Sequence, residues 1–241
     1  MLRRIYSVYS LSLFALIFLL MLPIFTLLIH TNRRHPLVYF LHRIWANLFY
    51  TFSFIPIKRQ YSKLIDFNKQ YIYCSNHFSY LDIPAIGSNK IRPIFVGKSS
   101  LGKIPLFGYM YRNIHITLDR QKLKSRYNAL EKCGRELENG RNLVIFPEGG
   151  IASKNPPKMA RFKEGAFRLA IEKQLPIVPI TIPYNWILLP DDGKLLLHRH
   201  RNIIVFHDPI ETKNMKLKDI GALKDKVFDT ISKELEARNK L

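Results

Sequence analysis

The segment Tyr71-Ile72-Tyr73-Cys74-Ser75-Asn76-His77-Phe78-Ser79-Tyr80-Leu81-Asp82 joins a short apolar run to a polar loop. Further apolar, β-branched or aromatic runs follow at Ile94–Val96, Ile114–Leu118, Leu143–Phe146, Ile177–Ile182 and Ile203–Phe206. Helical patterns separate several of these runs, most clearly at Lys122–Glu138 and Lys163–Lys173. Continuous apolar strands that alternate with helices are typical of a parallel sheet buried on both faces. The sequence therefore predicts an α/β fold with a largely parallel sheet flanked by helices.

The N-terminal segment carries no charged side chain from Ile5 to Ile29, a run of 25 residues. At about 1.5 Å per residue, a helix of this length crosses a hydrocarbon core of roughly 30 Å. A signal peptide is the alternative, but the run is longer than a typical h-region and no small-x-small cleavage pattern follows it. We therefore expect a retained membrane segment, either a spanning helix or a helical hairpin bent at Pro23.

A second stretch, Pro36–Phe54, has apolar residues at three- and four-residue spacing. The stripe consists of Leu37, Phe40, Leu41, Ile44, Trp45, Leu48 and Phe49. This spacing predicts an amphipathic helix, which either lies at the membrane interface or packs on the soluble domain. We expect membrane-anchoring helices over residues 1–58 and one α/β domain over residues 59–241.

Thirty-eight Lys and Arg residues against eighteen Asp and Glu residues give a formal net charge of +20. This charge indicates an anionic partner, which can be nucleic acid, an anionic membrane or a phosphate-bearing substrate. Basic residues after the first apolar stretch outnumber Arg3 and Arg4 before it: they are Arg33, Arg34, Arg43, Lys58 and Arg59. The bias predicts a membrane-bound protein whose domain lies on the cytoplasmic face, of the inner membrane if the organism is bacterial. The two cysteines, Cys74 and Cys133, have neither metal-ligand nor disulfide-framework spacing.

The end of the chain, from Lys216, carries one apolar stripe made of Leu217, Ile220, Leu223, Val227, Ile231 and Leu235. The stripe predicts an exposed amphipathic helix that ends the domain. A basic cluster, His198–Arg201, precedes it. We expect this cluster in a hairpin turn, where it is either solvated or in contact with a lipid headgroup.

His77 and Asp82 are candidate catalytic residues. A histidine can take a proton from an alcohol, and a carboxylate fixes its tautomer and stabilises the imidazolium. On a continuous helix their five-residue spacing would leave the side chains about 140° apart. Pro84 is tolerated in a first helical turn, so a helix beginning near Ser79–Asp82 leaves His77 in the preceding loop, from which it reaches Asp82. Taken alone, the spacing favours a helix cap beside an incidental histidine.

Two later segments also end apolar runs with polar groups. Phe146-Pro147-Glu148-Gly149-Gly150 forms a turn whose backbone N–H groups can bind an anion. Thr117–Arg120 ends in a guanidinium, which suits phosphate because its planar fork donates two parallel hydrogen bonds. In isolation, an ordinary turn explains the first segment equally well, and an arginine at a strand end is commonplace.

Together these segments resemble the four-block signature of the glycerolipid acyltransferase family, which includes glycerol-3-phosphate and lysophosphatidate acyltransferases. Asn76–Asp82 matches the first block, Arg120 ends the second, Phe146–Gly149 matches the third and Val178–Ile180 the fourth. Flanking similarity is found at Lys98, Lys103, Pro105, Gly108 and Arg161–Phe167. The resemblance covers roughly residues 60–210.

The resemblance implies that His77, oriented by Asp82, deprotonates the acceptor hydroxyl, which then attacks an acyl thioester without a covalent enzyme intermediate. It also implies that Arg120 and Lys163 hold the acceptor phosphate. The other residues expected to bind or shape the substrate site are Asn76, Ser79, Lys98, Glu148, Gly149, Gly150 and Pro179.

Two positions depart from the family pattern. The third block usually continues with Thr and often Arg, whereas here it continues Gly150-Ile151-Ala152-Ser153. Replacements for the missing hydroxyl and cation are available in Ser153, Lys154, Lys158 and Arg161, or the acceptor headgroup differs. His115 stands where the second block often has an aromatic residue, and we expect it on a strand face rather than as a second base.

The activity implied is that of a membrane-bound 1-acylglycerol-3-phosphate O-acyltransferase, which makes phosphatidic acid in phospholipid biosynthesis. The expected partners are a membrane lysophospholipid and an acyl-CoA or acyl-carrier protein donor, with no metal or cofactor. Two alternatives stay open: transfer to another lyso-lipid, such as a lyso-amino-acid lipid, and a noncatalytic membrane lipid-binding protein. Nucleic acid is not an expected partner, because the basic residues form no recognition motif and such a role leaves the charge-free N-terminal segment unexplained.

Overall fold

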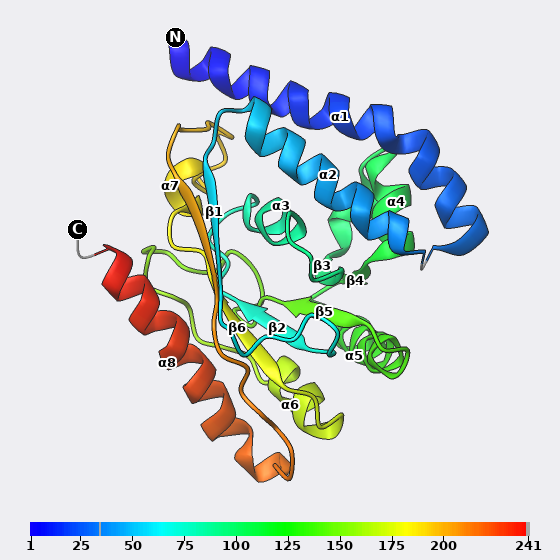
Figure 1. Cartoon of the computed structure of the whole chain (residues 1–241), viewed down its shortest axis with the longest axis vertical. Helices are drawn as coiled ribbons and strands as arrows, with labels where there is room; N and C mark the ends of the chain where they lie inside the picture. The colour runs from blue at the N-terminus through cyan, green and yellow to red at the C-terminus, as the bar shows by residue number, and fades with distance from the viewer. Residues whose placement is uncertain (34, 240–241) are drawn as a thin grey trace.

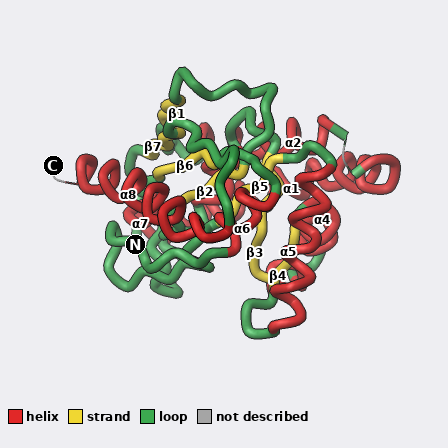
Figure 2. Tube along the Cα trace, turned by 90° about the horizontal axis from the view of Figure 1, so that it is seen from below, coloured by secondary structure: helices red, strands yellow, loops and turns green. Residues whose placement is uncertain are grey.

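A sheet of seven strands organises the computed structural model, which describes residues 1–33 and 35–239 (Figure 1). The strands are β1 Ile57–Tyr61, β2 Ile72–Ser75, β3 Pro93–Lys98, β4 Ile116–Leu118, β5 Asn142–Ile145, β6 Ile177–Thr181 and β7 Asn202–Phe206. Their order across the sheet is β1-β7-β6-β2-β5-β3-β4, which can be followed in Figure 2. All neighbouring strands are parallel except β6 and β7. The predicted α/β fold with a largely parallel sheet is confirmed.

Helices cover both faces of this sheet (Figure 1). They are α1 Leu2–Asn32, α2 Pro36–Phe52, α3 Asp82–Gly87, α4 Phe107–Ile114, α5 Leu123–Glu138, α6 Gly165–Glu172, α7 Asn185–Leu188 and α8 Ile220–Asn239, with 3₁₀ turns η1 Ser99–Lys103 and η2 Leu217–Asp219. Helices α5, α6 and α8 cover one face, where Phe167 and Ile231 are fully buried. Helices α2, α3 and α7 cover the other, where Tyr50 and Ile86 are buried. Burial from both sides explains the continuous apolar strands.

The structure differs from the sequence expectation around β1 and β4. His115 follows the last residue of α4, and its backbone N–H donates to the carbonyl oxygen of Tyr111. The expectation that His115 lies on a strand face is therefore wrong. The residue closes the last turn of α4, and β4 begins only at the next residue, Ile116. No strand is predicted at β1, which begins at Ile57, before the expected domain boundary at residue 59. The three central residues of β1, Lys58, Arg59 and Gln60, are polar, so the segment lacks the apolar run by which the other strands are predicted.

The C-terminal helix α8 begins at Ile220, four residues after Lys216, with η2 in between. Its stripe of Leu223, Val227 and Ile231 is buried against the domain, and residues on its other face, such as Asp225 and Lys226, are exposed, as in the predicted amphipathic helix. The expected hairpin turn at His198–Arg201 is wrong, because α7 and a long irregular loop connect β6 to β7. Arg34, counted in the basic bias of the sequence, lies outside the described residues.

Helix α1 runs unbroken through Pro23, so the first apolar stretch is one helix rather than a hairpin. It lies beside α2, as Figure 1 shows, and hydrogen bonds join it to the domain near both ends. The Arg3 guanidinium donates to the carbonyl oxygen of Leu196 (3.1 Å), and the Tyr109 hydroxyl lies 3.2 Å from Nδ1 of His30. By length and composition α1 could cross a membrane. Only 17% of its most apolar 18-residue segment is buried.

Helix α2 packs between α1 and the domain. Trp45 and Phe49 are buried, and the Trp45 indole N–H donates to the carbonyl oxygen of Phe14 in α1 (3.0 Å). Phe18 and Met110 complete an apolar cluster between α1, α2 and α4. The sequence left two interpretations of this helix open: a position at the membrane interface or packing on the domain. The buried face of α2 supports packing on the domain.

Candidate active site

The predicted functional residues converge at the carboxyl ends of β2, β5 and β6. These three strands are parallel neighbours, so the loops that follow them meet at one edge of the sheet. His77 follows β2, and Phe146–Gly150 follows β5. At the end of β6, the backbone N–H of Ile182 donates to Oδ1 of Asn76, and the Asn76 amide donates to the Ile182 carbonyl oxygen (2.8 and 2.9 Å). The Asn76 side chain therefore joins the ends of β2 and β6.

The predicted contact between His77 and Asp82 is present. Nδ1 of His77 lies 2.9 Å from Oδ2 of Asp82, across the junction between the loop and α3. The same carboxylate oxygen accepts hydrogen bonds from the backbone N–H groups of Phe78 and Ser79 (2.8 and 2.9 Å). Because a carboxylate can only accept, it places the imidazole proton on Nδ1 and leaves Nε2 free to receive a proton.

Asn185 is a residue that no sequence signal indicated. Its side-chain amide donates to Oδ1 of Asp82 (2.8 Å), so both oxygens of this fully buried carboxylate are hydrogen-bonded. Asn185 begins α7, more than a hundred residues after Asp82. Donors from two distant segments thus fix the carboxylate that orients His77.

His77 is also held by the loop after β5. Its ring stacks on Phe146 with centroids 3.9 Å apart and an interplanar angle of 17°. Its backbone N–H donates to Oε1 of Glu148 (2.8 Å), and the backbone N–H of Ala160 donates to Oε2 (2.7 Å). Burial raises the pKa of Glu148 to about 7, although the two N–H donors oppose the rise. Glu148 therefore joins the loop after β2 to two parts of the loop after β5, and both of its oxygens accept hydrogen bonds from protein groups.

Two cations lie over the paired glycines of this loop. Gly149 and Gly150 have φ values of +82° and +149°. A side chain at Gly150 would collide with the Arg120 guanidinium, and a Cβ at Gly149 would lie 2.7 Å from Nζ of Lys163. Because neither residue carries a Cβ, the two positive groups rest against one short stretch of backbone. The arrangement is suited to binding a phosphate.

The remaining predicted residues are placed as follows. Lys98 ends β3 and pairs with Leu118 of β4, two residues before Arg120, so it lies at the same edge of the sheet and is exposed. The Ser79 hydroxyl is buried and donates to the carbonyl oxygen of Leu189 (2.7 Å). Pro179 is buried within β6, opposite Cys74 of β2. For Ser79, Pro179, Asn76 and Glu148 the contacts seen are with the protein itself, and binding of substrate stays a prediction.

His115 lies away from this pair. Its ring stacks on His42 with centroids 5.3 Å apart, and burial lowers the pKa of both imidazoles. Both rings line an apolar cavity of about 460 Å³ that lies under α1 and α2. The described residues contain no group of three or more His, Cys, Asp or Glu side chains arranged to hold a metal ion.

The apolar cavity extends from the catalytic loop. Tyr80 and Ile83 line it on either side of Asp82, and Gly87 lines it from the end of α3. Phe18 of α1 and Met110 of α4 form other parts of its wall. A cavity with these walls can hold a hydrocarbon chain, and it begins at residues next to Asp82.

An α/β fold with a buried histidine–aspartate pair beside a cationic glycine loop defines a protein able to activate a hydroxyl group next to an anion. The family model described as Acyltransferase matches residues 56–183, just over half of the chain, so the chain belongs to the acyltransferase family. The family predicted from the four motifs is thereby confirmed.

Several curated proteins named 1-acyl-sn-glycerol-3-phosphate acyltransferase are similar to this chain. One from Saccharomyces cerevisiae is 35% identical over 67% of this chain and 54% of its own length. A chloroplastic one from Brassica napus is 27% identical over 89% of this chain and 58% of its own length. The chain therefore spans little more than half the length of these relatives. The crystal structure of the 1-acyl-sn-glycerophosphate (LPA) acyltransferase PlsC from Thermotoga maritima has the same fold, with a TM-score of 0.78, 21% identity and coverage of 98% of this chain and 97% of that one.

Proposed function

We propose that the protein is a membrane-associated 1-acylglycerol-3-phosphate O-acyltransferase. The observation that carries the proposal is the buried His77–Asp82 pair beside the cations Arg120 and Lys163. The pair supplies a base for a hydroxyl, and the cations supply a site for a phosphate on the same molecule. The names of the similar proteins support this acceptor.

The reaction then needs one base and no covalent enzyme intermediate. Nε2 of His77 takes the proton of the acceptor hydroxyl, and the resulting oxygen nucleophile attacks the thioester carbonyl carbon. The C–S bond of the tetrahedral intermediate breaks, and the imidazolium returns its proton to the leaving thiolate. Asp82 stabilises the imidazolium between these two transfers, as a buried carboxylate does in other histidine-dependent acyl transfers.

The proposal is tested by an acyl-transfer assay on the purified full chain. Lysophosphatidate, lysophosphatidylcholine and a lyso-amino-acid lipid are offered as acceptors, each with acyl-CoA and with acyl-carrier protein as donor. We expect transfer to lysophosphatidate. Gly150 favours a second candidate, transfer to another lyso-lipid, because it replaces the Thr usual in the family. Preference for another acceptor would select that candidate, and no transfer to any acceptor would contradict both.

Arg120 is expected to act mainly in acceptor binding. In Arg120→Ala, loss of a charged donor to phosphate should raise the KM for lysophosphatidate by about 10- to 100-fold, because hydrogen bonds to charged groups contribute roughly 1.5–3 kcal/mol. The KM for the acyl donor should stay near its wild-type value. Steady-state kinetics with each substrate varied in turn check this split. The control is Arg126→Ala, which removes an exposed arginine from α5. A change confined to the donor would contradict the phosphate role.

The apolar cavity is proposed to hold a fatty acyl chain. Gly87 gives a clean test, because a Cβ added there meets no atom within 4 Å and the residue lines the cavity. In Gly87→Leu the new side chain fills part of that space. We expect kcat/KM for long acyl donors to fall by about tenfold or more, since a filled pocket excludes several methylene groups at roughly 0.8 kcal/mol each. Short acyl donors should be used nearly as well as before. A uniform loss at every chain length would contradict the assignment.

Membrane association is proposed to involve α1. Its apolar side chains are largely exposed, with Leu16, Leu20 and Leu27 each at least half exposed. Since both ends of α1 are hydrogen-bonded to the domain, we propose that the helix lies along the bilayer surface with this face in the lipid. We propose that this surface is the cytoplasmic leaflet, because its anionic lipids attract the basic residues that follow the first apolar stretch.

A further inference from the structure

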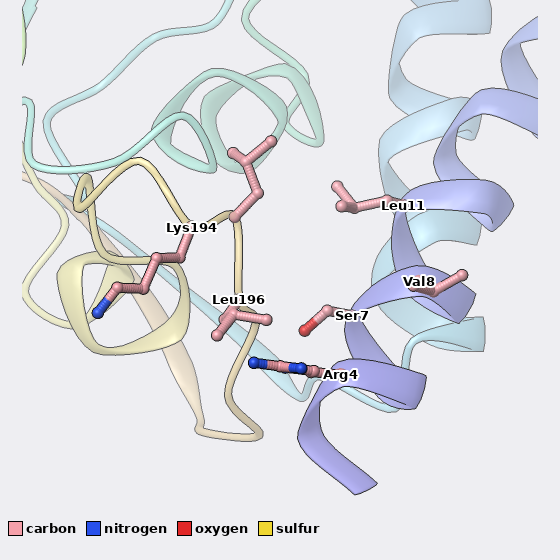
Figure 3. Close-up of a pocket in the computed structure, with 7 residues that line it drawn as sticks. Arg4, Ser7, Val8, Leu11, Lys194 and Leu196 are labelled. Atoms are coloured by element: carbon pink, nitrogen blue, oxygen red, sulfur yellow. The ribbon is translucent and has the colours of Figure 1, made fainter. Parts of the chain in front are cut away.

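A second hollow, of about 450 Å³, lies between the start of α1 and the loop before β7 (Figure 3). The hollow is lined by Arg4, Ser7, Val8, Leu11 and Lys194–Leu196. None of these residues lines the apolar cavity beside the catalytic loop. Figure 3 shows the Arg4 guanidinium beside Leu196, between the helix and the loop, whereas the Lys194 side chain points away from α1. The backbone N–H of Leu197 donates to the Ser7 hydroxyl (2.9 Å) and holds the two walls together.

Cations lie in and beside this hollow. Arg4 and Lys194 line it, and Arg3 donates to the carbonyl oxygen of Leu196. Arg199 lies further along the same loop, and these four cations together with the hollow are called the N-terminal basic surface. Arg199 lies 5.9 Å from the centre of the Phe54 ring, close to the start of α1. The acidic residues of the same loop are Asp191 and Asp192, and Asp192 lies 4.0 Å from Lys194. Four cations against two carboxylates leave the surface positive, even when the two histidines of the loop, His198 and His200, are counted as neutral.

Large apolar side chains stand among these cations. Ile5 is 57% exposed, Val8 65%, Phe54 63% and Leu195 48%. Scattered exposed apolar residues are ordinary, but a group of them bordered by Arg and Lys is typical of a surface that meets a lipid headgroup region. A nucleic-acid partner would leave these apolar groups without a matching environment, and the apolar face of α1 proposed to lie in the lipid favours a bilayer over a protein partner.

The basic surface is also linked to the catalytic loop. The loop that lines the hollow begins at Leu189, whose carbonyl oxygen accepts the hydrogen bond from Ser79. It continues to Leu197, which is bonded to Ser7 of α1. The segment Leu189–Leu197 therefore connects His77's loop to the start of α1.

We propose that the N-terminal basic surface binds the headgroup of an anionic phospholipid in the bilayer. Arg4 and Arg199 face the phosphate, and the side chains of Leu11 and Leu195 contact the acyl chain. The proposal rests on the membrane association proposed above and adds to it a selectivity for anionic lipid. This headgroup site is distinct from the acceptor site at Arg120 and Lys163.

The test compares binding of the full chain to two kinds of vesicle, phosphatidylcholine alone and phosphatidylcholine with phosphatidylglycerol, by co-sedimentation. The double variant Arg4→Glu with Arg199→Glu should bind the anionic vesicles about tenfold or more weakly, because basic residues near an anionic surface each contribute to binding. Its binding to phosphatidylcholine alone should change little. The matched control, Lys132→Glu with Lys226→Glu, makes the same charge change at exposed positions of α5 and α8 and should keep most of the anionic binding.

A second variant, Arg4→Gln with Arg199→Gln, repeats the measurement without adding negative charge. Acyl transfer in detergent micelles should match the wild type in both variants, which shows that the fold and the active site are intact. Equal losses in the control pair would overturn the site, because net charge alone would then explain the binding. Equal affinity of the wild type for the two kinds of vesicle would also overturn it. Failure of the wild type to bind either kind would instead contradict the membrane association itself.

Discussion

Replacement of His77 by alanine is expected to lower kcat for acyl transfer by about 10²- to 10⁴-fold, the usual contribution of a positioned general base. The ring is the only part removed, and Asp82 keeps its hydrogen bonds from Phe78, Ser79 and Asn185. The KM values should change much less than kcat, because the proposed phosphate site at Arg120 and Lys163 is untouched. Initial rates at saturating lysophosphatidate and donor check the prediction.

The matched control for this variant is His200→Ala, in the loop before β7, which should retain wild-type activity. Thermal unfolding of His77→Ala must be cooperative, because the ring also stacks on Phe146 and its loss leaves a small cavity. A folded His77→Ala enzyme with a rate within twofold of the wild type would show that another group is the base.

Asp82→Asn is expected to lower kcat by on the order of 10³-fold with little effect on folding. The asparagine oxygen can still accept from Nδ1 of His77 and from the backbone N–H groups of Phe78 and Ser79. Its new amide group faces Asn185, whose side-chain oxygen is buried and has no hydrogen-bond partner among the described residues. A flip of the Asn185 amide therefore accommodates the change, and the variant loses charge but not structure.

Asp82→Ala makes the contrasting control. It leaves two backbone N–H groups, the Asn185 amide and the His77 imidazole without their acceptor in a buried site. The free energy of unfolding should fall by roughly 3–5 kcal/mol, as for other buried charge networks that lose one partner. Urea denaturation separates the two variants. Equal stability of Asp82→Asn and Asp82→Ala would contradict the bonding described, and a wild-type kcat in Asp82→Asn would contradict the role of the charge.

The sequence predicts the parts of this molecule that depend on local pattern. A loop that enters a helix near Pro84 allows the contact between His77 and Asp82. The spacing alone favours an incidental histidine, and it is the order of the four motifs that predicts the pair. The convergence of this pair with Phe146–Gly150 follows from strands whose apolar runs indicate a parallel sheet. Arg120 and Lys163 lie beside Gly149 and Gly150 because Arg120 follows the end of a strand and Lys163 precedes the start of a helix.

Individual hydrogen bonds between distant segments cannot be predicted from one sequence. Nothing near Asn185 marks it as a partner of Asp82, since the link depends on where α7 begins in space. Glu148 was expected to shape a substrate pocket, yet its oxygens accept from the backbone of His77 and Ala160. The apolar cavity combines walls from α1, α2, α3 and α4, and no single segment shows it.

The residues that hold the catalytic loop come late in the chain, and this order affects how the active site forms during translation. Asn76, Asp82 and Ser79 take their partners from Ile182, Asn185 and Leu189, each 103 to 110 residues later. During synthesis, His77 therefore emerges long before the groups that fix its carboxylate partner. A nascent chain that ends at residue 183 contains all four motifs and the whole segment matched by the family model, but lacks Asn185 and Leu189. Such a chain should display the motifs without an assembled base, so the active site matures only when the segment after β6 has folded back across the sheet.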